Sequence, residues 1–181
     1  PSKQYLCNGH FLLTFILPMI RFFTSLLLLF CFHSILGQTK IDKVIQHWNK
    51  NSVPYISIDQ LVAAKDPILL DAREKEEFDV SHLQHAIWVG DKAFNIDSVH
   101  LKISNKNTPL VVYCSVGVRS EDIGEKLLAN GYTHVRNLYG GIFEWKNDGH
   151  AVYDDAGRET DSIHAFSKHW GKLLTNGIKV Y

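Results

Sequence analysis

One short segment of the sequence places a cysteine among residues that could make it a nucleophile. The segment consists of Cys114, Ser115, Val116, Gly117, Val118, Arg119 and Ser120. A backbone that curls round Cys114 would direct several N–H groups inward and form an anion-binding nest. Gly117 allows the dihedral angles of such a curl, and Arg119 adds a planar cation that favours the nucleophilic thiolate. The segment therefore predicts covalent catalysis by Cys114, with residues 115–120 binding the anionic groups of a substrate.

The residues on either side of this segment predict the elements that position it. Leu110–Tyr113 is an apolar strand that leads directly into Cys114, and residues 120–130 predict a helix that Gly131 ends. Parallel α/β sheets bind their ligands at the carboxyl ends of the strands, and a helix N-terminus attracts anions. Cys114 therefore lies where such a fold binds anionic substrates, and no histidine base is required.

Short apolar strands alternate with helices along the rest of the chain. Further strands are predicted over residues 55–58, 67–70, 86–89 and 135–138. Further helices are predicted over residues 41–48, 74–80 and 96–103, from a cap at Ser57 or Asp59 to residue 64, and from the turn at 140–141 to residue 145. This alternation predicts an α/β domain with a mostly parallel sheet.

The last part of the chain carries a different pattern. Residues 154–160 are polar and predict a loop. Residues 161–174 predict a terminal helix with one apolar face, formed by Ile163, Phe166, Trp170 and Leu173. We expect this face to pack against the edge of its own domain rather than against a partner.

The composition is that of a single globular domain and excludes several classes of protein. Of the 181 residues, 45% are hydrophobic and 21% are charged, and the formal net charge is zero. No basic stripe indicates binding to nucleic acid or to an anionic membrane surface. The ten histidines are scattered, so we expect neither a metal site nor a cofactor.

The first 37 residues have the pattern of a leader. Residues 19–21 form a short positive start, residues 22–32 are apolar, and small residues follow at Ser34 and Gly37. This order predicts a secretory signal peptide cleaved after Gly37, and hence a periplasmic or secreted protein. An uncleaved membrane anchor over residues 11–36 is the alternative, and it would be the only contact with a membrane.

The cysteines follow from this interpretation. Cleavage would remove Cys7 and Cys31 and leave Cys114 without a partner in its own chain. An unpaired cysteine in an oxidising compartment is either reactive or paired with another molecule. The expected organisation is a leader over 1–37, a lead-in helix over 38–54, the main domain over 55–153 and a C-terminal extension over 154–181.

Three separated motifs within about residues 55–152 resemble those of the rhodanese family of sulfurtransferases. The first is Asp71-Ala72-Arg73-Glu74 with Glu77-Phe78 and Ser81-His82-Leu83, the second is Cys114 to Arg119, and the third is Leu138-Tyr139-Gly140-Gly141-Ile142-Phe143-Glu144-Trp145. The resemblance implies a single three-layer α/β domain with a central parallel sheet. It also implies that Cys114 takes the outer sulfur of a small anion such as thiosulfate as a persulfide. The persulfide would pass that sulfur to a thiophilic acceptor such as cyanide, a thiol or another protein.

Details of the motifs bear on the activity. The six residues from Cys114 to Arg119 match the sulfurtransferases of the family, whereas related phosphatases have seven. Ser115 stands where many thiosulfate-using members carry Lys or Arg, so one positive charge is missing from the donor pocket. Asp71 and Arg73 could support the active loop, or they could form an internal ion pair that holds the fold, which we favour. Glu77 is expected to be structural as well.

Two other functions are compatible with these residues. The domain could be a non-enzymatic module that carries sulfur, senses oxidants or binds a partner protein. A redox sensor would need a resolving thiol from a partner, since the mature chain has no second cysteine. A phosphatase is the other alternative, and the length of the loop argues against it.

Overall fold

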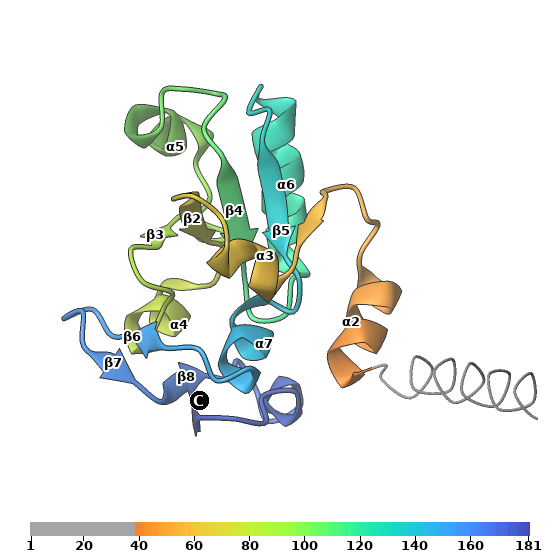
Figure 1. The fold of residues 1–181 in the computed structure, drawn as a ribbon, viewed down its shortest axis with the longest axis vertical. Helices are drawn as coiled ribbons and strands as arrows, with labels where there is room; N and C mark the ends of the chain where they lie inside the picture. Colours follow the sequence, from red (N-terminus) through yellow and green to blue (C-terminus); the bar gives the residue numbers. More distant parts are fainter. Residues whose placement is uncertain (1–38) are drawn as a thin grey trace, which may run out of the picture. The chain divides into compact units, whose positions relative to one another are not determined.

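Five parallel strands form the central sheet of the computed structural model, which describes residues 39–181 (Figure 1). The strands are β1 (Tyr55–Ile56), β2 (Ile68–Asp71), β3 (Ile87–Trp88), β4 (Leu110–Tyr113) and β5 (Val135–Leu138). Their order across the sheet is β1-β5-β4-β2-β3, and every neighbouring pair is parallel. The predicted parallel sheet is therefore confirmed, and β4, which leads into Cys114, lies at its centre.

Six helices connect these strands at almost the predicted positions. They are α2 (Lys40–Trp48), α3 (Ile58–Val62), α4 (Lys75–Val80), α5 (Ile96–Lys102), α6 (Arg119–Ala129) and α7 (Gly141–Asn147). Of the two predicted caps for α3, Ser57 is the one used: its side chain accepts from the Gln60 N–H, and the Gln60 side chain accepts from the Ser57 N–H. Gly131 follows α6 with a φ of 89°, as expected for a residue that ends a helix.

The two faces of the sheet are covered by different helices. Side chains alternate between the faces of a strand, so Val111 and Tyr113 of β4 join one buried cluster while Leu110 and Val112 join the other. The first cluster includes residues of α2, α3 and α7, and the second includes residues of α5 and α6. The three layers implied by the resemblance are thus present, and Cys114 emerges between them.

The predicted helix over residues 161–174 is wrong. Residues Ser162–His164 form strand β8, which pairs in parallel with β9 (Ile178–Val180), and Trp170–Lys172 is a single 3-10 turn, η1. Phe166 has a φ of 61°, which is left-handed backbone and incompatible with a right-handed helix. The polar stretch 154–160 is also more ordered than a loop, because β7 (Glu159–Thr160) pairs antiparallel with β6 (Val152–Tyr153).

The C-terminal segment belongs to the core of the domain, as the expected packing on the domain's own edge requires. Ile163, Ala165 and Leu174 are fully buried in the same cluster as Ile142 and Phe143 of α7. Strand β8 lies beside α4, at the end of the sheet where α7 begins (Figure 1). Phe166 is the exception, because half of its side chain remains exposed.

Replacing Ile163 by alanine is expected to lower the free energy of unfolding by about 2–5 kcal/mol, because a buried Ile→Ala change leaves a cavity. Ile178 on the paired strand β9 is 61% exposed, so Ile178→Ala should change stability by no more than about 0.5 kcal/mol. Urea unfolding of both variants measures the difference. Equal small losses would show that the segment does not contribute to the core.

The leader predicted over residues 1–37 lies outside the described residues. Within residues 39–181, no helix combines the length and the apolar character that crossing a membrane requires.

Candidate functional site

The cysteine loop lies at the carboxyl end of the central strand. Cys114 directly follows β4, is 1% exposed and has a free thiol. The N–H of Gly117 donates to the Cys114 sulfur at 3.2 Å. Gly117 has a φ of 99°, so the predicted use of glycine for the curl is observed. The loop therefore turns back on the sulfur and directs at least one backbone donor at it.

The first turn of α7 fixes the carbonyl side of the loop. The N–H groups of Ile142 and Phe143 donate to the carbonyl oxygens of Cys114 and Ser115, at 2.9 and 3.0 Å. These donors have no partner inside their own helix, so the loop satisfies them. In a trans peptide the N–H points away from the C=O, so the N–H groups that follow these carbonyls face away from α7. This geometry provides one side of the anion-binding nest.

Two asparagines that the sequence analysis missed hold the turn at Gly117. The side-chain amides of Asn49 and Asn137 each donate to the Gly117 carbonyl at 2.8 Å. The Asn137 carbonyl oxygen accepts from the hydroxyl of Ser120 at 2.8 Å, and that hydroxyl lies 3.5 Å from the Cys114 sulfur. Asn137 is fully buried in β5, and a lone amide in an apolar strand was the signal that could have identified it.

Glu77 of α4 connects the ends of the loop. Its carboxylate accepts two hydrogen bonds from the Arg119 guanidinium, at 2.6 and 2.9 Å, and one from the Ser115 hydroxyl at 3.0 Å. Arg119 also donates to the Ser115 oxygen at 2.8 Å. The carboxylate is 1% exposed as a residue. The sequence analysis assigned Glu77 to the fold alone, whereas it orients two residues of the loop.

The charges of this group balance one another. Burial raises the pKa of Glu77, but the hydrogen bonds and the charge of Arg119 outweigh burial and lower it below its usual value. Burial lowers the pKa of Arg119, but its hydrogen bonds to Glu77 and the nearby Cys114 sulfur outweigh burial and raise it. The positive potential that the sequence assigns to Arg119 is therefore largely neutralised by Glu77.

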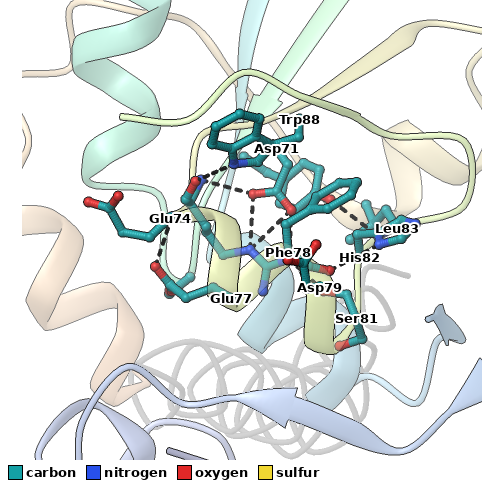
Figure 2. Close-up of polar contacts among 12 residues, drawn as sticks. Asp71, Glu74, Glu77, Phe78, Asp79, Ser81, His82, Leu83 and Trp88 are labelled. Atoms are coloured by element: carbon teal, nitrogen blue, oxygen red, sulfur yellow. Dashed lines mark hydrogen bonds and ion pairs between the residues drawn. The ribbon is translucent and has the colours of Figure 1, made fainter. Parts of the chain in front are cut away.

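Asp71 and Arg73 form an internal ion pair. The Arg73 guanidinium approaches the Asp71 carboxylate to 2.6 Å, and both side chains are 0% exposed. Arg73 also donates to the Ser81 carbonyl at 2.6 Å, while its own carbonyl accepts from the Trp88 indole N–H at 2.9 Å (Figure 2). Of the two roles that the sequence left open for this pair, the geometry matches the structural one.

A cavity of about 220 Å³ opens over Cys114. Part of its lining comes from the loop: Cys114, Ser115, Val116, Val118 and Arg119. The rest comes from three aromatic side chains outside the loop, Trp48 at the end of α2 and Phe166 and Trp170 from the C-terminal segment. The sequence analysis did not assign these aromatic residues to the site, because nothing local in the sequence connects them to Cys114.

A second cavity, of about 230 Å³, lies between β3 and α5 and does not include Cys114. Within residues 39–181, no group of His, Cys, Asp and Glu side chains is arranged to hold a metal ion.

Comparisons with known proteins agree with this geometry. The model of the rhodanese-like domain family matches residues 57–148. The adenylyltransferase and sulfurtransferase UBA4 of Candida albicans is 31% identical over 117 residues, which are 62% of this chain and 26% of that protein. The tRNA uridine(34) hydroxylase of Wigglesworthia glossinidia brevipalpis is 31% identical over 91 residues, which are 48% of this chain and 29% of that protein. The chain thus spans less than a third of the length of either relative.

Among solved structures, the thiosulfate sulfurtransferase of Pseudomonas aeruginosa has a TM-score of 0.52 at 22% identity, covering 69% of this chain and 24% of that one. A rhodanese-like domain from Anabaena sp. has a TM-score of 0.50 at 19% identity, covering 56% of this chain and 79% of that one. These similarities support the same fold. Because the family model covers just over half of the 181 residues and contains the cysteine loop, the chain belongs to the rhodanese-like domain family.

Proposed function

We propose that this protein is a sulfurtransferase that carries sulfane sulfur as a persulfide on Cys114. The observation that carries the proposal is the position of the Cys114 sulfur at the floor of a cavity, with the Gly117 N–H donating to it at 3.2 Å. A thiolate or a terminal persulfide sulfur is stabilised by such fixed backbone donors. The printed names of similar proteins, which include sulfurtransferases, support the same chemistry.

The proposed reaction is a double displacement on sulfur. The Cys114 thiolate attacks the outer sulfur of the donor, the S–S bond of the donor breaks, and the leaving group departs with the bonding electron pair. An acceptor then attacks the outer sulfur of the Cys114 persulfide and releases the thiolate. With thiosulfate and cyanide as donor and acceptor, the products are sulfite and thiocyanate, and neither step requires a cofactor.

The intact mass of the purified protein tests this proposal. After incubation with excess thiosulfate or an organic thiosulfonate, we expect a gain of one sulfur atom that cyanide removes, with release of thiocyanate. Cys114→Ala should show no gain. Two oxygen atoms have nearly the same mass as one sulfur, but a sulfinic acid is not reversed by cyanide. A protein that gains no cyanide-labile sulfur from either donor would contradict the proposal.

A further inference from the structure

The walls of the cavity over Cys114 are aromatic rather than charged. Trp48 and Phe166 are 60% and 50% exposed, although large apolar side chains are usually covered. Both line the cavity together with Trp170. Three aromatic rings from two distant parts of the chain thus surround the entrance to one sulfur atom, and their exposure is not explained by packing of the core.

The cavity offers little charge to a doubly charged ligand. Of the described residues that line it, only Arg119 is charged, and its guanidinium is held by Glu77 through two hydrogen bonds. Ser115 stands beside this pair and is itself neutral. The ring of Phe166 covers the Arg119 guanidinium at 5.1 Å, which is cation–π distance. A dianion would therefore meet a nearly neutral, apolar surface above the backbone donors of the loop.

The backbone at Phe166 is a second observation that concerns this wall. Its φ of 61° is rare for a bulky residue and strained for any L-amino acid except glycine and, to a lesser degree, asparagine. The conformation is held by the Phe166 N–H, which donates to the His164 ring at 3.1 Å, and by the pairing of Ala165 with Val180. Strained residues that the surrounding structure over-determines cluster at ligand sites.

We infer that the cavity selects a sulfur donor with an apolar alkyl or aryl body and no more than one negative charge, which is a persulfide or thiosulfonate of an organic group. This inference rests on the proposed function and names the substrate class of the same site. The apolar body lies against Trp48, Phe166 and Trp170, and the outer sulfur faces Cys114. With a thiosulfonate, the thiolate takes the outer sulfur and the sulfinate leaves with the electron pair, so charge and atoms balance.

Three probes separate the contributions of body and charge. Benzenethiosulfonate and methanethiosulfonate share the reacting group and the charge but differ in the apolar body, whereas methanethiosulfonate and thiosulfate differ in charge. We expect kcat/KM to fall in the order benzenethiosulfonate, methanethiosulfonate, thiosulfate. The ratio of the first two should fall about tenfold in Phe166→Gly, as expected when roughly 50 Å² of apolar contact is lost. Trp48→Ala should lower the same ratio.

Two controls keep the test independent of folding. Glycine adopts a φ of 61° without strain, so Phe166→Gly should unfold at a temperature equal to or above that of the wild type. Leu101→Ala removes an apolar side chain that is 88% exposed and lies outside the cavity, so it should leave the ratio unchanged.

The remaining outcomes distinguish this inference from the proposed function. If every donor transfers sulfur but Phe166→Gly and Trp48→Ala leave the ratio unchanged, the apolar site is refuted and the sulfurtransferase stands. If thiosulfate exceeds methanethiosulfonate in the wild type, the charge argument is refuted. If none of the three donors delivers cyanide-labile sulfur, the proposed function fails and the inference fails with it.

Discussion

Replacing Gly141 by alanine is expected to lower the free energy of unfolding by about 3 kcal/mol or more and to remove most sulfur transfer. Gly141 has a φ of 55°, which disfavours other residues by about 1–2 kcal/mol. A Cβ atom at this position would also lie 2.3 Å from the Cys114 carbonyl oxygen and 2.8 Å from the Ser115 carbonyl carbon. Overpacking of this kind adds about 1–3 kcal/mol. Because the clash is with the backbone of the cysteine loop, the loop must shift and the first turn of α7 must release it.

Gly157 provides the matched control for this substitution. Its φ is 72°, but a Cβ atom there would meet nothing within 4 Å. Gly157→Ala should therefore lose only the strain contribution of about 1–2 kcal/mol and keep full activity. Urea unfolding and kcat/KM for sulfur transfer, measured on both variants, separate the clash from the strain. Equal stabilities in the two variants, with sulfur transfer intact in Gly141→Ala, would show that α7 does not fix the loop.

The central part of the fold could be predicted from sequence because its signals are local. The apolar strand Leu110–Tyr113 and the helix that follows the loop each have their own periodicity, and Gly117 marks the one turn between them. Parallel pairing then follows from the alternation of strands and helices. The cysteine, the loop and their place at the centre of the sheet therefore needed no knowledge of distant contacts.

The walls of the site could not be predicted, because long-range contacts create them. Glu77 and Arg119 are 42 positions apart, and Asn49 and Gly117 are 68 positions apart. The apolar residues from Ile163 to Leu173 recur at helical spacing, yet the pairing of β8 with β9 satisfies the backbone instead. A helix there would have hidden Phe166, whereas the observed chain presents its ring at the cavity. Tertiary contacts thus outweighed the local periodicity where the site acquires its specificity.

Replacing Glu77 by glutamine is expected to lower the free energy of unfolding at neutral pH by about 3 kcal/mol, since removing one partner of a buried ion pair leaves the other charge unpaired. The value lies at the lower end of that range because the Arg119 side chain is 20% exposed. Glutamine has nearly the same shape, so packing is kept. Asp79→Asn is the matched control: Asp79 lies on the same helix and pairs with Lys75, but both side chains are over 40% exposed. That change should lose less than about 1 kcal/mol.

The pH dependence of this difference reports the charge of Glu77. Arg119 lowers the pKa of Glu77 in the folded protein, against the opposing effect of burial, so the folded value lies below the unfolded value of about 4.3. The carboxylate therefore stabilises the fold fully above the unfolded pKa, and this stabilisation is lost as the pH falls through the folded pKa. Urea unfolding should show a constant gap between wild type and Glu77→Gln above about pH 5.5, which narrows on acidification below about pH 4. A gap that stays constant down to the lowest pH at which the protein folds would mean that Glu77 acts only as a hydrogen-bond acceptor. In that case the charge of Arg119 would remain available to an anionic donor.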